Sequence, residues 1–257
     1  MAYETLKIQQ DLVEWLSLTG DQLRRHLHSP LEVTTKSGRN DLVTNLDKQT
    51  EQFYVQQIRQ HYPEAHICGE EGFGDQLTDL TGLVFFVDPI DGTMNFVRQK
   101  NNFATMIGVY LDGQPLVGAI LDVIGEKLLV GGAETGVQLN GYPLTPIAPA
   151  PIAEGLLGVN AMMYAHNGYH LQDLAAQTSG VRVTGSAGLE FIQVITGQQN
   201  GYVSSLSPWD VAAGWAIGQG VGIEAHNLAG QQPQLREQEV IIAGIPEIWR
   251  SFQKLQN

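Results

Sequence analysis

The chain has 257 residues and a net charge of −13, with 43% hydrophobic and 16% charged residues. The acidic charge excludes a general nucleic-acid-binding protein, which needs a basic face. No apolar stretch approaches the length of a membrane span. The N-terminus lacks the basic-then-apolar pattern of a signal peptide, so we expect a cytoplasmic protein without a membrane partner. The single cysteine, Cys68, excludes an internal disulfide and is expected to be a small buried residue.

The first third of the chain predicts helices around a short extended segment. Apolar residues recur at helical spacing over residues 6–28, which predicts one amphipathic helix or a pair, with a break at Gly20 and Asp21. A polar loop at 36–41 then leads through a short apolar segment to a second helical pattern that ends before Pro63. Asp47 precedes this pattern, and its local context favours a helix N-cap over a catalytic residue.

Two neighbouring acids, Glu70 and Glu71, follow a short apolar segment and are framed by glycines. Successive side chains of an extended chain point to opposite faces. At most one of the two acids can therefore face a given metal ion.

A continuous apolar run at 84–87 predicts a strand that is buried on both faces and stops before Pro89. Asp88 and Asp91 then leave the end of one strand. Gly92 lets the main chain approach a ligand closely, and Thr93 is expected at a helix N-terminus that attracts an anion. A turn capped by its own Asp side chains is the alternative. We favour a metal site, because two carboxylates on one buried strand repel each other unless a cation lies between them.

The rest of the chain predicts two different sheets. Alternating strands and turn signals over 103–139 predict an antiparallel meander beside the central strand. Residues 141–154 hold four of the eleven prolines and are expected to form a boundary. Beyond them strands alternate with helices, which predicts an α/β region. Its helices open at 185–188 and after 207, and Asp210 lies where an N-cap is expected.

Three motifs in this order resemble the inositol monophosphatase family, part of a lithium-sensitive, magnesium-dependent phosphatase superfamily. They are Gly69-Glu70-Glu71, Asp88-Pro89-Ile90-Asp91-Gly92-Thr93-Met94-Asn95-Phe96 and Trp209-Asp210-Val211-Ala212-Ala213-Gly214, and the segments 41–47 and 185–187 also match. The resemblance implies a layered α-β-α-β-α sandwich of mixed α+β and α/β type. Residues 1–140 would form an N-terminal α+β part with most metal ligands. Residues 141–257 would form a C-terminal α/β part that contributes Asp210 and substrate contacts.

The resemblance also implies roles for individual residues, with two to three Mg²⁺ ions in each active site. The implied metal ligands are Glu70, Asp88, the carbonyl of Ile90, Asp91 and Asp210. The implied catalytic residues are Asp47 and Thr93, which orient and deprotonate the attacking water, and Glu70, which contacts a third ion. The implied phosphate and substrate contacts are Asp91, the main-chain N–H groups of Gly92 and Thr93, Ser186 and Asp210.

The implied activity is the Mg²⁺-dependent hydrolysis of a small-molecule phosphate monoester by activated water, and the family implies a homodimer. Inositol-specific members carry an acid shortly before the Trp-Asp motif, whereas residues 202–208 contain none. Fructose 1,6-bisphosphate, 3′-phosphoadenosine 5′-phosphate and NADP therefore remain alternative substrates. A non-catalytic regulatory member that binds a partner is a further alternative, and so is a metal-dependent diesterase, because paired carboxylates also serve phosphodiester cleavage.

Overall fold

A seven-stranded sheet forms the larger half of the computed structural model, which describes residues 2–35, 38, 42–148 and 150–256. Its strands lie in the order β3-β4-β5-β6-β7-β8-β9, with β3 and β4 parallel and the remaining pairs antiparallel. The predicted meander is thus confirmed. The strands are β3 (His66–Gly69), β4 (Leu83–Asp91), β5 (Ala104–Leu111), β6 (Gln114–Asp122), β7 (Lys127–Gly132), β8 (Gly136–Leu139) and β9 (Tyr142–Pro143).

A five-stranded mixed sheet forms the second half, in the order β11-β10-β12-β14-β13. A short two-stranded ribbon of β1 (Val33–Thr35) and β2 (Leu42–Thr44) precedes the large sheet along the chain. The strands of the second sheet are β10 (Leu156–Val159), β11 (Gly180–Arg182), β12 (Gly201–Leu206), β13 (Glu224–Asn227) and β14 (Glu239–Gly244).

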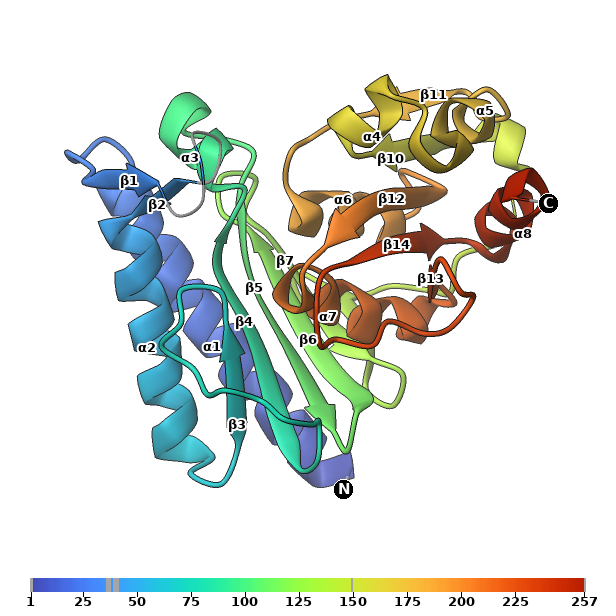
Figure 1. Cartoon of the computed structure of the whole chain (residues 1–257). Helices are drawn as coiled ribbons and strands as arrows, with labels where there is room; N and C mark the ends of the chain where they lie inside the picture. The colour runs from blue at the N-terminus through green and yellow to red at the C-terminus, as the bar shows by residue number, and fades with distance from the viewer. Residues whose placement is uncertain (1, 36–37, 39–41, 149, 257) are drawn as a thin grey trace.

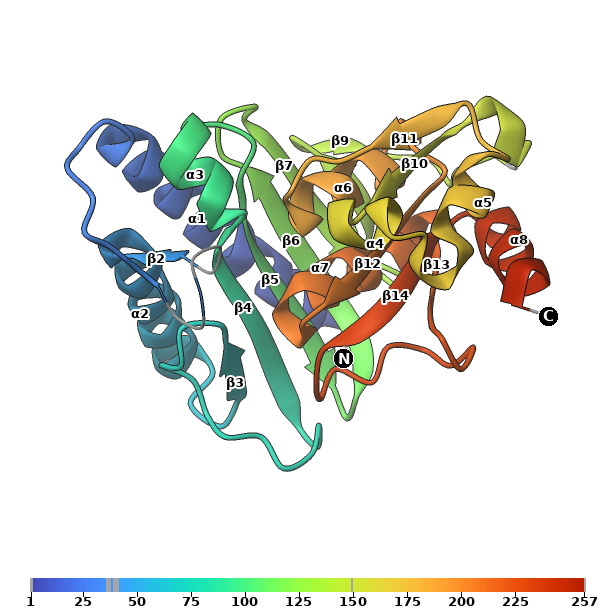
Figure 2. The same ribbon diagram turned by 45° about the horizontal axis from the view of Figure 1, so that its top comes forward.

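Helices fill three layers around the two sheets, as Figures 1 and 2 show. The long helices α1 (Ala2–His26) and α2 (Asn45–His61) cover the outer face of the large sheet, and α6 (Ala187–Ile195) and α7 (Pro208–Gly218) lie between the sheets. The outermost layer holds α4 (Ala161–Ala165), α5 (Leu171–Ala175) and α8 (Pro246–Gln256), while α3 (Thr93–Gln99) follows β4. The expected α-β-α-β-α sandwich is confirmed.

Small residues bring α7 against the large sheet. A Cβ at Gly108 would lie 2.6 Å from the main chain at Ala212 and Ala213, so only glycine permits this approach. The Tyr110 hydroxyl donates a hydrogen bond to the Ala212 carbonyl at 2.9 Å. One buried apolar cluster therefore includes residues of both sheets. Among the described residues, no helix combines the length and the apolar character needed to span a membrane.

Two details of the predicted elements were wrong. Helix α1 continues through Gly20 without a break. This glycine allows close packing on the sheet, because a Cβ there would lie 2.4 Å from the Leu121 side chain. Strand β4 continues through Pro89 to Asp91, with a register shift between Asp88 and Asp91. The tolerated position for a strand proline is such a bulge, where no ladder donor is required.

Candidate active site

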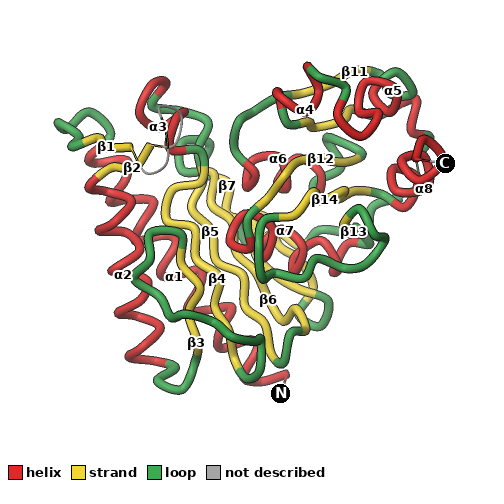
Figure 3. The backbone as a smooth tube through the Cα atoms, viewed as in Figure 1, coloured by secondary structure: helices red, strands yellow, loops and turns green. Residues whose placement is uncertain are grey.

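The end of β4 carries two buried carboxylates, Asp88 and Asp91. Figure 3 traces β4 beside β5 in the large sheet. Asp88 is 1% exposed, and its Oδ1 atom has no hydrogen-bond partner among the described residues. Asp91 is held from the other half of the chain. Its Oδ1 accepts the Ala187 N–H at 2.9 Å, and its Oδ2 accepts the Gly188 N–H at 2.8 Å and the Ser186 hydroxyl.

A third carboxylate, Asp210, comes from the first turn of α7. The expected N-cap role was wrong: the N-cap is Ser207, whose backbone N–H donates to Asp210 Oδ2 at 2.7 Å. The carboxylate of Asp210 is thereby turned toward the end of β4. Oxygen atoms of Asp88, Asp91 and Asp210 lie within 4.8 Å of one another.

Glu70 lies beside these three acids without joining their group. It follows β3, and its backbone N–H donates to the Val87 carbonyl of the parallel strand β4 at 3.2 Å. Its side chain lies beside Asp88. Its charge also helps to raise the pKa values of Asp88, Asp91 and Asp210.

Burial and mutual repulsion oppose ionisation of this cluster. Burial is the main cause for each group, and it raises the pKa of Asp91 to about 6 and that of Asp210 to about 8. The pKa of Asp88 lies well above its usual value, through burial and then through the charges of its acidic neighbours. Buried acids that approach this closely are the donor set that a hard divalent cation binds. The oxygens fit Mg²⁺, and the unpartnered Asp88 Oδ1 supports this assignment.

Asp47 lies at the start of α2, where its predicted N-cap role was also wrong. Thr44 is the N-cap, and its N–H and hydroxyl donate to Asp47 Oδ2 at 2.8 and 2.5 Å. The Thr93 hydroxyl lies 3.0 Å from Asp47 Oδ1 and 3.0 Å from the Ile90 carbonyl. Burial raises the pKa of Asp47, while the hydrogen bonds from Thr44 and Thr93 oppose this rise.

The turn between β4 and α3 has a backbone conformation that favours glycine. Gly92 has φ of 86°, a left-handed value that favours glycine, and Thr93 begins α3. The Asn95 amide donates to the carbonyls of Asn102 and Thr184, both at 2.8 Å, and so joins this turn to the loop before α6. The Ser186 hydroxyl is directed at Asp91, so the contact seen orients a carboxylate; its expected substrate contact stays a prediction.

A cavity of about 300 Å³ opens beside Asp91 and Asp210, lined also by Asn160, Tyr202 and Ser204. Its wall includes Glu190, an acid that sequence reasoning missed. Glu190 accepts hydrogen bonds from the Thr184 N–H, the Thr184 hydroxyl and the Gln199 amide, and burial raises its pKa. The sequence feature that could have identified Glu190 is its position on α6, one helical turn after Ser186.

Comparisons with known proteins give one result for the family and the fold. Residues 6–256 match the inositol monophosphatase family. The chain is 36% identical to the inositol-1-monophosphatase of Bacillus subtilis (strain 168), covering 96% of this chain and 95% of that protein. It is 30% identical to the Nus factor SuhB of Escherichia coli (strain K12), covering 91% and 89%. A solved IMPase/NADP phosphatase complexed with Mg²⁺ and phosphate shares the fold, with a TM-score of 0.90, 24% identity, and coverage of 99% and 96%.

Proposed function

Because the chain belongs to the inositol monophosphatase family and is a phosphatase of phosphoric monoesters, we propose that Mg²⁺ bound by Asp88, Asp91, Asp210 and Glu70 supports this hydrolysis. The convergence of three carboxylates within 4.8 Å around an unpartnered Asp88 oxygen carries the proposal. We also assign the Ile90 carbonyl to this set. Two to three ions would be held, as the sequence resemblance implies.

When bound, Mg²⁺ supplies positive charge to the phosphate and lowers the pKa of a water molecule. Thr93 and Asp47 then position this water molecule and accept its proton. The Thr93 hydroxyl has one proton and two acceptors at 3.0 Å, Asp47 and the Ile90 carbonyl. If the Ile90 carbonyl held a cation, the Thr93 hydroxyl would donate its proton to Asp47. The Thr93 oxygen can then accept a proton from water while its own proton passes to Asp47, which is the proposed general base.

The phosphate is assigned to the main-chain N–H groups of Gly92 and Thr93, with Asp91, Ser186 and Asp210 around it. The alcohol part of the substrate is assigned to the adjacent cavity. Strand β12 presents Tyr202, Ser204 and Leu206 to this cavity, with no carboxylate to accept hydroxyl protons. The acids that line the cavity come from other elements: Glu190, whose oxygens accept hydrogen bonds from Thr184 and Gln199, and the proposed metal ligands Asp91 and Asp210. A site whose acids are engaged in this way loses discrimination for a polyol. The substrate is therefore sought among inositol 1-phosphate, fructose 1,6-bisphosphate, 3′-phosphoadenosine 5′-phosphate and NADP.

The test is phosphate release from these four esters with Mg²⁺, with EDTA, and with Mg²⁺ plus Li⁺. We expect Mg²⁺-dependent release from at least one ester and inhibition by Li⁺. The Asp88→Asn variant is the control for contaminating phosphatase, since it removes the acid at the centre of the site. Release that persists with EDTA or in this variant would contradict the metal assignment. Faster turnover of bis-p-nitrophenyl phosphate than of the monoesters would favour a diesterase.

Regulation through a partner is the second candidate, because one relative carries the name of a Nus factor. Phosphate release from none of the esters, together with co-purification of a partner with Asp88→Asn, would favour it. We further propose a cytoplasmic homodimer with an N-terminal part at 1–140 and a C-terminal part at 141–257. Light scattering during gel filtration measures the dimer directly.

A further inference from the structure

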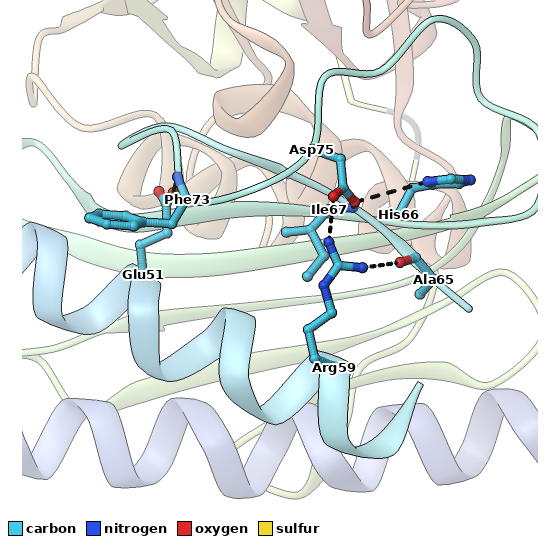
Figure 4. A network of polar contacts seen from close by, with 7 residues as sticks. All are labelled: Glu51, Arg59, Ala65, His66, Ile67, Phe73 and Asp75. Carbon is cyan, nitrogen blue, oxygen red and sulfur yellow. Dashed lines mark hydrogen bonds and ion pairs between the residues drawn. The ribbon is translucent and has the colours of Figure 1, made fainter. Parts of the chain in front are cut away.

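A carboxylate without a role in the proposed chemistry lies buried under the segment that carries Glu70. Glu51 is 0% exposed and comes from α2. Its Oε2 accepts the Glu71 N–H at 2.6 Å, and its Oε1 accepts the Phe73 N–H at 2.8 Å. Figure 4 shows the carboxylate rising from the helix to the main chain at Phe73. The two donors lie one and three residues after Glu70 along the chain.

The main chain also approaches Glu51 from the other side of Glu70. A Cβ at Gly69 would lie 2.4 Å from Glu51 Oε1. A side chain at position 69 would displace the Glu51 carboxylate. The residue before Glu70 and the residues after it are thus fitted around one buried acid.

The base of the same segment is tied to α2 by a second set of contacts. Asp75 accepts the Ile67 N–H at 2.9 Å, and its own N–H donates to the Ile67 carbonyl at 2.6 Å. Arg59 of α2 donates to Asp75 at 2.5 Å and to the Ala65 carbonyl at 2.7 Å (Figure 4). Hydrogen bonds between Ile67 and Asp75 therefore join the two ends of this segment, Arg59 ties it to α2, and the Glu51 carboxylate binds the main chain inside it.

We propose that Glu51 is a positioning residue that holds the main chain around Glu70, so that the Glu70 side chain stays beside Asp88. Hydrogen bonds from backbone N–H groups to a carboxylate are short and strong, and burial keeps water from replacing them. Asp47 lies one turn before Glu51 on α2, so a single helix sets both the proposed base and the Glu70 segment. This inference rests on the proposed function, in which Glu70 helps to hold Mg²⁺.

The test compares Glu51→Gln with wild type by Mg²⁺ calorimetry and by hydrogen exchange in metal-free buffer. Glutamine keeps the size of the side chain but turns one acceptor into a donor that faces an N–H group. We expect about 10-fold weaker Mg²⁺ binding, the lower end of the loss typical for groups that orient a ligand. We also expect faster amide exchange at 70–73. Exposed Glu64→Gln is the matched control, and Ile58→Val controls for lost stability of α2.

A double-mutant cycle separates positioning from general weakening of the fold. If Glu51 acts through Glu70, then adding Glu51→Gln to Glu70→Gln leaves Mg²⁺ affinity nearly unchanged. If Glu51→Gln fails to fold, Gly69→Ala tests the same contact from the segment itself. This variant should then show the weaker Mg²⁺ binding and the faster amide exchange at 70–73. Wild-type Mg²⁺ affinity and exchange in Glu51→Gln, or additive losses in the cycle, would overturn the inference. A wild type that binds Mg²⁺ but hydrolyses no ester contradicts the proposed function alone.

Discussion

The beginnings of α2 and α7 use one arrangement for two different purposes. In each, an Asp at the third helical position accepts the backbone N–H of the N-cap residue. Thr44 donates to Asp47 at 2.8 Å, and Ser207 donates to Asp210 at 2.7 Å. This contact satisfies a donor that helix formation leaves free, and it fixes the direction of the carboxylate.

The surroundings of the two carboxylates differ, and this difference assigns their chemistry. Asp47 meets the hydroxyl of Thr93, so it is suited to receive a proton. Asp210 meets Asp88 and Asp91, so it is suited to share a cation. A local sequence pattern therefore sets the orientation of each carboxylate, while residues from elsewhere in the chain determine the role that we propose for it.

Replacing Asp210 by Asn is expected to give the largest effect. It should lower kcat/KM by about 10³-fold, the upper range for loss of one electrostatic group at a reacting centre. Mg²⁺ affinity should fall as well, because an amide binds a cation less strongly than a carboxylate does. Steady-state kinetics and Mg²⁺ calorimetry measure the two losses. Unchanged Mg²⁺ binding would remove Asp210 from the ligand set.

Replacing Asp47 by Asn should distinguish the role of Asp47 at the start of α2 from that of Asp210 at the start of α7. We expect kcat to fall by about 100-fold, the lower range for a positioned general base. Mg²⁺ affinity should stay near the wild-type value, because Asp47 binds hydroxyl and amide donors and lies outside the group of three acids. The same kinetics and calorimetry apply. A joint loss of Mg²⁺ binding and turnover would show that Asp47 belongs with Asp210.

Local sequence features predicted much of the fold. The sequence predicts the positions of β4 and of the strand after it directly, because each is a short continuous apolar run that is buried on both faces. The break at Gly20 was wrong because a distant residue, Leu121, decides what that glycine does. The extension of β4 past Pro89 depends on pairing with β5, which no local pattern contains.

The site was less predictable than the strands. The donors to Asp91 come from Ser186, Ala187 and Gly188, nearly a hundred residues later. No spacing rule joins them, and the roles of single residues came from the family resemblance. The spacing Thr44 to Asp47, repeated at Ser207 to Asp210, was a visible capping-box signal that the N-cap assignments overlooked.

The pH dependence of stability tests the acids of the proposed metal site without any mutation. The folded-state pKa values of Asp91 and Asp210 are raised to about 6 and about 8 from 3.8. The folded protein therefore holds protons that the unfolded chain has lost, and its stability falls as pH rises from about 4 to 8. In EDTA the melting temperature should decrease across this range. Mg²⁺ at 100 times its Kd should add about 2.7 kcal/mol; a melting temperature that rises with pH in EDTA would contradict this.

Replacing the N-cap residues Thr44 and Ser207 by Ala should have the smallest effects on activity and should affect the two helices differently. Thr44→Ala removes a hydroxyl that donates to Asp47 at 2.5 Å, whereas Ser207 holds the Asp210 carboxylate through its backbone N–H. Thr44→Ala should cost about 1 kcal/mol of stability, as is usual for an N-cap whose side chain accepts backbone N–H groups. Only Thr44→Ala should raise the pKa of Asp47, because its hydrogen bond opposes the effect of burial. The acidic limb of the kcat profile should therefore move to higher pH in Thr44→Ala and stay in place in Ser207→Ala. Equal shifts in both variants would mean that capping acts on activity only through the stability of the helices.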